Sequence, residues 1–124
     1  MTIQPDVLAV ARGFGLDPAL LQAVVIAEGD IVRAVQCSIP LVTTREQALR
    51  VAARSAVHAM CDWIKDDNDR QQAFIVFWAG RWAPIGAAND PKNLNAYWAS
   101  NVVRLWLKGS ISLARNSREP VTEK

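Results

Sequence analysis

Apolar side chains recur at helical spacing through most of this sequence, and no stretch alternates apolar and polar residues for long enough to predict a strand. The longest helical pattern runs through residues 44–64, where apolar positions lie three or four residues apart. This spacing places them on one face of a helix, whereas a half-buried strand needs strict alternation. The sequence therefore predicts an all-α fold of five to six helices.

One predicted helix has clear signals at both ends. Asp17 is a good N-cap residue, and Pro18 suits the first helical position. Gly29 is placed to end this helix directly after Glu28. We therefore expect Glu28 to be the last residue of a largely apolar helix.

The longest helix also has a start signal, because Thr44 and Gln47 have the spacing of a capping box. The helices are expected over residues 5–14, 18–28, 31–37, 44–64, 69–82 and 94–108, with Gly109 as the final stop. They are predicted to form one domain over residues 1–110, because 51% hydrophobic residues are enough for a single packed core. Residues 111–124 are expected to form a polar, flexible tail.

Charge and hydropathy exclude several classes of function. A net charge of +2 is too small to indicate a nucleic-acid partner, so none is expected. The apolar stretches are shorter than the ~20 residues that a bilayer requires, so no transmembrane helix is expected. The N-terminus has no basic leader, long apolar run or cleavage site typical of a secretory signal. We therefore expect synthesis in a cytoplasm without a signal peptide.

Residues that often carry metal or nucleophilic chemistry are sparse. Cys37 and Cys61 stand in unlike contexts, and we expect two reduced, mostly buried thiols. His58 shares a helix face with Arg54 and Asp62, at four-residue spacing. One histidine and a nearby cysteine are too few for a metal site, and they rarely meet as a nucleophilic pair on one helix. We expect no metal, no cofactor and a structural role for His58.

Glu28 is the strongest candidate for chemistry. A carboxylate at a helix C-terminus faces the negative end of the helix dipole, which disfavours its ionised form, and apolar cover adds to this effect. Such a carboxyl can hold a proton near neutral pH, as the general acid of a glycosidase must. The alternative is an ordinary solvated residue at a helix end.

Two stretches resemble proteins of the lysozyme-like superfamily. The segment LDPALLQAVVIAEGD, residues 16–30, resembles the first active-site helix of soluble lytic transglycosylases and phage muramidases, where the catalytic Glu precedes Ser or Gly. The segment FWAGRWAPIGAANDPKNLNAYWASNVVRLW, residues 77–106, is similar to a module of phage-encoded lysozyme-like proteins. The resemblance implies a lysozyme-like helical domain with Glu28 as its catalytic acid.

The resemblance also implies a substrate, the glycan strands of peptidoglycan, and a reaction. In lytic transglycosylases a single Glu acts first as acid and then as base, while a hydroxyl of the substrate closes an anhydro ring. Hydrolysis would use a second group, for which Asp30, Asp90 or an organised water is a candidate. The two carboxyl groups would lie about 6.5–9.5 Å apart for inversion or about 5–5.5 Å apart for retention.

Aromatic and amide side chains after residue 80 are candidates for a sugar-binding wall. Flat rings stack on the apolar faces of sugars, and amides hydrogen bond to their hydroxyl groups. The candidate substrate-binding residues are Trp82, Asn89, Asp90, Asn95, Tyr97 and Trp98. The alternative is that the tryptophans are core residues and that Asn89 and Asp90 form a turn before Pro91.

Three functions remain open. The first is peptidoglycan cleavage by a phage or prophage protein, made in the bacterial host and acting at the cell wall after release or within a virion. The second is a non-catalytic virion component, of the tail or head-to-tail connector, that binds other virion proteins. It is favoured because residues 31–47 do not reproduce the Gly-Leu-Met-Gln type segment that lines the cleft of lytic transglycosylases. The third is an unrelated helical interaction domain.

Overall fold

The computed structural model describes residues 2–83 and 94–118, with side chains for residues 2–83 and 95–111. Within these ranges the protein is helical and has no strand, which confirms the expected all-α fold. The elements are α1 (Pro5–Phe14), α2 (Pro18–Glu28), α3 (Ile31–Gln36), α4 (Arg45–Lys65), η1 (Asp69–Gln71), α5 (Phe74–Trp82), η2 (Leu94–Tyr97) and α6 (Trp98–Arg118), where η is a 3₁₀ helix. In this described part, no helix combines the length and hydropathy that crossing a bilayer would need.

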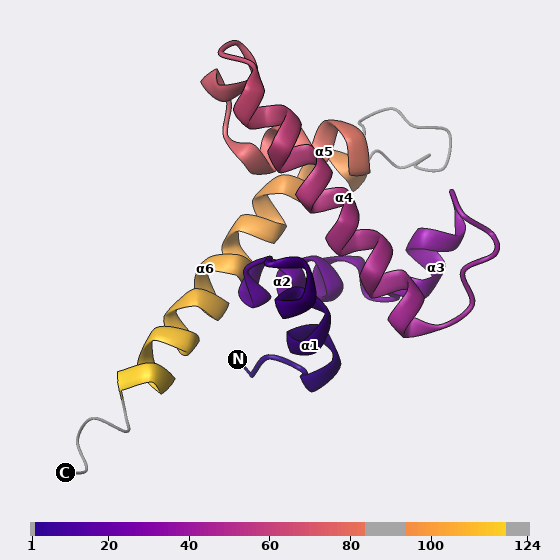
Figure 1. Ribbon diagram of the computed structural model, residues 1–124, viewed down its shortest axis with the longest axis vertical. Coiled ribbons are helices and arrows are strands. Elements are labelled where there is room, and N and C mark those ends of the chain that lie inside the picture. Colours follow the sequence, from indigo (N-terminus) through magenta and orange to yellow (C-terminus); the bar gives the residue numbers. More distant parts are fainter. Residues whose placement is uncertain (1, 84–93, 119–124) are drawn as a thin grey trace.

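The two longest helices, α4 and α6, extend through the molecule, and the shorter helices pack around them (Figure 1). Helix α2 packs along α6, while α1 and α3 pack against α4, and α5 contacts both long helices. The C-terminal end of α6 projects away from the other helices (Figure 1). This arrangement brings the ends of α2 and α5 and the start of α6 into one region.

Helix α2 lies at the centre of the hydrophobic core. All residues of its segment 19–25 are buried, which agrees with a helix that is apolar on nearly every side. Trp78 of α5 is the largest side chain that is fully buried. Because both helices are anchored in the core, the residues at their C-terminal ends are held in fixed positions.

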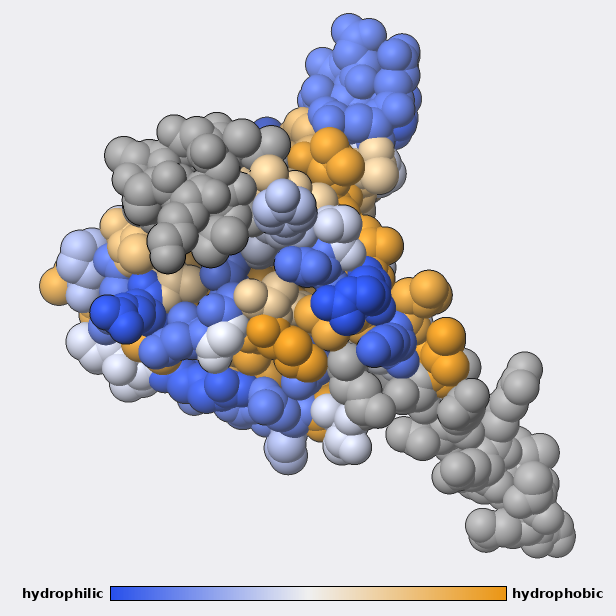
Figure 2. Space-filling model, turned by 180° about the vertical axis from the view of Figure 1, so that it is seen from behind, coloured by the Kyte–Doolittle hydropathy of each residue, from blue (hydrophilic) through white to orange (hydrophobic). Residues whose placement is uncertain are grey.

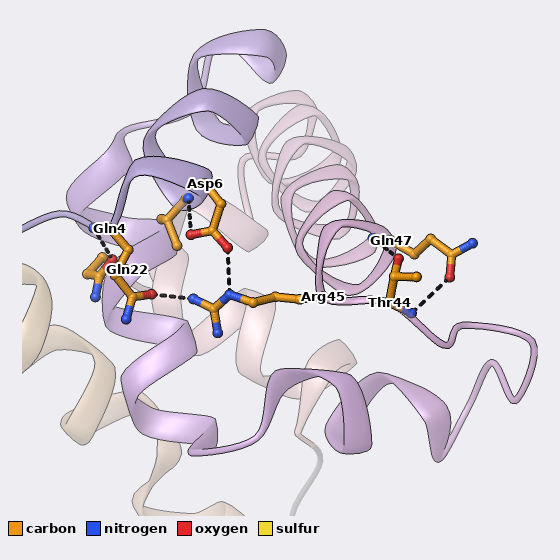
Figure 3. A network of polar contacts seen from close by, with 7 residues as sticks. Gln4, Asp6, Gln22, Thr44, Arg45 and Gln47 are labelled. Atoms are coloured by element: carbon orange, nitrogen blue, oxygen red, sulfur yellow. Dashed lines mark hydrogen bonds and ion pairs between the residues drawn. The ribbon is translucent and has the colours of Figure 1, made fainter.

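A polar network ties the N-terminus to α2 and α4 (Figure 3). The buried side chain of Gln22 accepts a hydrogen bond from the backbone N–H of Gln4 at 3.1 Å. Arg45 donates through Nε to Asp6 at 2.6 Å and through Nη2 to the side chain of Gln4. These bonds connect the first residue of α4 to α1 and, through Gln4, to α2.

The helix starts expected from the sequence are confirmed at two places. Asp17 accepts a hydrogen bond from the backbone N–H of Ala19 at 2.9 Å and caps α2. The backbone N–H of Gln47 donates to Thr44 Oγ1 at 3.1 Å, and the Gln47 side chain accepts from the Thr44 N–H at 3.1 Å. The capping box at the start of α4 is therefore formed.

Two helix boundaries differ from those expected. The helix predicted over residues 69–82 is divided into η1 and α5, because Gln72 and Ala73 have extended backbone angles. The polar residues 65–72 thus form a hydrophilic projection, visible at the top of Figure 2, rather than part of one helix. The stop predicted at Gly109 is wrong, since α6 continues to Arg118. Gly109 is buried there and lies within the helix.

The two cysteines differ from expectation in their exposure. Cys37 and Cys61 are free, but both are exposed rather than buried. Cys37 follows the end of α3, and Cys61 lies on the exposed side of α4. The expectation that both thiols are mostly buried is therefore wrong.

Candidate functional site

A tight turn leaves Glu28 as the final residue of α2. Gly29 has φ 76° and ψ −59°, and the backbone N–H of Asp30 donates to the Glu28 carbonyl at 2.9 Å. This bond, with those angles at the central residue, defines a γ-turn that glycine adopts most readily. The chain therefore leaves the helix abruptly, and the half-buried Glu28 side chain extends from the helix end.

The Glu28 carboxyl group is held by two tryptophans from other helices. Trp82, the last residue of α5, donates its indole Nε1–H to Glu28 Oε2 at 2.7 Å. Trp98, the first residue of α6, donates to the same oxygen at 2.8 Å. Two donors from different helices thus fix this carboxyl oxygen in position.

A third tryptophan supports this pair from within the core. The ring of Trp78 meets the Trp98 ring edge to face, with centroids 5.4 Å apart, and lies 5.8 Å from the Trp82 ring. Trp78 is itself fixed, because it is fully buried and its Nε1–H donates to Ser55 Oγ at 2.9 Å. The two donors to Glu28 therefore rest on a rigid aromatic base.

Glu28 lines a groove with a volume of about 590 Å³, within the usual range for small-molecule sites. Helices α3 and α4, the loop after α3, the end of α5 and η2 form its walls. The lining residues are Glu28, Ala34, Val35, Cys37, Ser38, Ile39, Val51, Ser55, Arg81, Trp82, Ala83 and Asn95. The groove combines apolar surface with hydroxyl, amide and guanidinium donors, a mixture suited to a hydroxylated ligand.

The residues expected to bind substrate lie in different environments. Trp82 and Asn95 line the groove. Trp98 does not line it, because its ring is buried in the core and only its indole N–H bonds to Glu28. Tyr97 is 63% exposed but does not line the groove. Asn89 and Asp90 lie outside the described residues. Trp98 is thus a core residue whose indole N–H bonds to Glu28.

Asp30, the candidate second carboxylate, has a local structural role. Its Oδ1 accepts a hydrogen bond from the backbone N–H of Arg33 at 3.1 Å, which caps α3. It is exposed and is absent from the groove lining. A carboxylate engaged in this way is poorly placed to act opposite Glu28.

Sequence reasoning missed three polar residues of the groove, Ser38, Ser55 and Arg81. Arg81 immediately precedes Trp82, and Ser55 follows Arg54 in the middle of α4. Neither position carries a motif, and their proximity to Glu28 results from the packing of α4 against α5. No group of three or more potential metal-binding His, Cys, Asp or Glu side chains occurs within the described ranges.

Comparisons with known proteins give no match to any family model, curated protein or solved structure. The resemblance to lysozyme-like proteins therefore stays a prediction from two short stretches of sequence.

Proposed function

We propose that this protein cleaves the glycan strands of peptidoglycan, with Glu28 as the general acid. The observation that supports this most directly is the pair of indole N–H bonds to Oε2 in a groove. An indole N–H can only donate, so Oε2 must act as an acceptor. In the neutral carboxyl group, this makes Oε2 the carbonyl oxygen and leaves the proton on Oε1.

The reaction would begin with transfer of the Oε1 proton to the leaving-group oxygen as the glycosidic bond breaks. The carboxylate that remains would be stabilised by the two N–H donors, which are already oriented before the charge develops. The carboxylate would then accept a proton from the attacking nucleophile. That nucleophile is either a hydroxyl of the same sugar, which closes an anhydro ring, or a water molecule.

The single-carboxylate reaction, as in lytic transglycosylases, fits the described residues better than hydrolysis with two carboxylates. Asp30 caps α3 and does not line the groove, and no other acidic side chain lines it in the part of the chain that the structure describes. The product of this reaction would be an anhydro sugar, one water lighter than the product of hydrolysis.

The lining of the groove supports a sugar ligand. The Trp82 ring offers a flat apolar surface, and Ser38 and Asn95 offer groups that bond to hydroxyls. The substrate lies outside the cytoplasm, so we propose that the protein reaches the cell wall after release from the bacterial host or as part of a virion.

The test is the loss of turbidity of purified peptidoglycan or of chloroform-permeabilised Gram-negative cells. Wild type should clear the suspension, and Glu28→Gln should be slower by about 10²–10⁴-fold, the usual contribution of a general acid. The glutamine carbonyl can still accept an indole N–H, so this variant should fold, which circular dichroism would verify.

Asp30→Asn is the matched control, because asparagine also caps helices and the neighbouring carboxylate is removed. It should retain wild-type clearing. If folded wild type and Glu28→Gln both leave the suspension unchanged, the proposed activity is wrong. Mass spectrometry of the released fragments would distinguish anhydro products from hydrolysed ones.

A second candidate function, a non-catalytic virion component, is favoured by the outer face of α6. Val103, Leu107 and Ile111 lie four residues apart and are 46%, 61% and 47% exposed. Figure 2 shows apolar side chains on the edge of the molecule where α6 leaves the body. Such a face suits a protein partner, with about 800 Å² buried on each side. In this case wild type would not clear peptidoglycan, and Leu107→Gln would impair incorporation into virions.

A further inference from the structure

A second hollow, with a volume of about 330 Å³, adjoins the Glu28 groove. It is lined by Ile39, Val51, Arg54, Ser55, His58 and Arg81. Four of these residues, Ile39, Val51, Ser55 and Arg81, also line the groove. The two spaces are therefore neighbouring parts of one depression, and a polymer with a side group could occupy both.

The lining of this second hollow is basic. Arg54 and His58 lie one turn apart on α4, and Arg81 comes from the last turn of α5. None of the described residues that line the hollow is acidic. The hydroxyl of Ser55 accepts the Trp78 N–H, so its own proton is available to a ligand. The hollow thus offers hydrogen-bond donors and positive charge to a ligand, and no carboxylate among its described lining residues would repel an anion.

The three basic side chains differ in how far they are already paired. Arg81 donates through Nη1 to Asp62 at 2.7 Å and lies over the Phe77 ring at 4.7 Å, which fixes its guanidinium. Within the described chain, neither Arg54 nor His58 forms an ion pair, although the Arg54 guanidinium lies over the Phe14 ring, 6.0 Å from its centroid. Arg81 is therefore held by both a carboxylate and a ring, whereas Arg54 has a ring contact but no carboxylate partner and can pair with an anion.

We propose that this basic hollow binds a carboxylate on the side groups of the glycan strand whose backbone occupies the Glu28 groove. This inference rests on the proposed function. In peptidoglycan, alternate sugars carry a lactyl ether, which ends in a carboxylate or continues into an acidic peptide. Guanidinium groups recognise carboxylates through paired N–H donors. Binding the carboxylate beside Glu28 would select peptidoglycan over uncharged glycans such as chitin and would align the strand.

The single histidine provides a direct readout, because the His58 imidazole gives one set of proton resonances. Three probes that contain no bond to cleave would be titrated into wild type at neutral pH. N-acetylmuramic acid carries the lactyl carboxylate, N-acetylmuramyl-L-alanyl-D-isoglutamine carries a peptide carboxylate, and N-acetylglucosamine carries neither. We expect one or both acidic probes to shift the His58 resonance to saturation, less tightly at higher salt, and the neutral sugar to leave it unchanged.

Arg54→Gln removes the unpaired guanidinium and should weaken binding of the acidic probes about tenfold. Arg50→Gln is the control with the same change in charge. Arg50 lies one turn earlier on α4, is paired with Glu46 at 3.0 Å and does not line the hollow. Both arginines are exposed, so both variants should fold. Arg50→Gln should bind the probes as wild type does.

Equal responses to the acidic and neutral probes, or wild-type binding by Arg54→Gln, would overturn the inference. A preference for N-acetylmuramic acid would assign the hollow to the lactyl carboxylate, and a preference for the dipeptide would assign it to the peptide. The titration requires no bond cleavage. Clearing of peptidoglycan without a preference for acidic probes would thus reject this inference alone, and acidic-probe binding without clearing would reject only the proposed activity.

Discussion

Trp98 donates its indole N–H to Glu28 Oε2 at 2.8 Å, although 70 positions separate the two residues in the chain. Trp82 makes a second bond to the same oxygen at 2.7 Å. Because the donors come from the end of α5 and the start of α6, the carboxyl group is restrained from two directions. The orientation of Glu28 is thus a property of three helices packed together.

Replacing Trp98 with phenylalanine should separate this orienting role from packing. Phenylalanine keeps an aromatic ring against Trp78 and removes the N–H. We expect the free energy of unfolding, measured in urea, to fall by about 1–3 kcal/mol, from the lost hydrogen bond and the smaller buried ring. If Glu28 cleaves glycans, kcat should fall about tenfold with little change in KM, since only the position of the proton is affected.

Trp106→Phe is the control for Trp98→Phe. Its indole N–H donates to Asp17 at 2.8 Å, and Trp106 does not line the groove. The variant should lose comparable stability but keep the wild-type rate. A wild-type rate in Trp98→Phe would contradict the orienting role.

The bond from Trp78 to Ser55 should contribute to stability because its donor belongs to a fully buried side chain. Ser55→Ala removes the acceptor and should lower the free energy of unfolding by about 1–2 kcal/mol. A double-mutant cycle with Trp78→Phe isolates this bond. In the Trp78→Phe background, Ser55→Ala should have almost no cost. If Ser55→Ala lowered the free energy of unfolding equally in both backgrounds, the loss of stability would not come from the bond to Trp78.

The γ-turn at Gly29 should tolerate alanine poorly, even though a Cβ there would meet nothing within 4 Å. The cost comes from the backbone, because φ is 76°. We expect Gly29→Ala to lower the free energy of unfolding by about 1–3 kcal/mol. Gly80→Ala, inside α5 and equally open, should instead raise it by about 0.5–1 kcal/mol. Thermal or urea unfolding would measure the change in the free energy of unfolding for each variant, and we expect the two changes to have opposite signs.

The contact between Asp6 and Arg45 should make stability depend on pH in the acid range. The hydrogen bond from Arg45 holds the pKa of Asp6 below its ordinary value of 3.8, and burial opposes this only in part. Since the pKa is lower in the folded state, the contribution is complete above about pH 4 and is lost as the pH falls through the folded-state pKa. Both side chains are more than 40% exposed, so we expect at most about 1 kcal/mol.

Urea unfolding of wild type and Asp6→Asn would measure this dependence. Wild type should be the more stable protein at pH 7, and the two should converge toward pH 2. Glu46→Gln removes a fully local ion pair with Arg50 on the surface of α4 and should show a smaller difference at pH 7. A difference between wild type and Asp6→Asn that stays constant with pH would exclude the ionised Asp6 as its origin.

The sequence predicted the features of the fold that depend on neighbouring residues. The cap at Asp17, the capping box at Thr44 and the stop at Gly29 are all confirmed. Each involves hydrogen bonds or backbone angles within a few residues, so local sequence contains the information. The stop expected at Gly109 is wrong because a glycine can either end a helix or lie within one, and only the tertiary structure distinguishes the two cases.

The position of Glu28 at a helix end was therefore determined by the sequence alone, and what surrounds it was decided by the tertiary structure. Burial of the apolar faces of α2, α5 and α6 brings Trp82 and Trp98 to one carboxyl oxygen, across 54 and 70 positions of the chain. The packing of α5 against α4 places Arg81 and Arg54 in the lining of one hollow. The spacing of neighbouring residues does not predict such contacts, because they depend on the packing of side chains far apart in the chain.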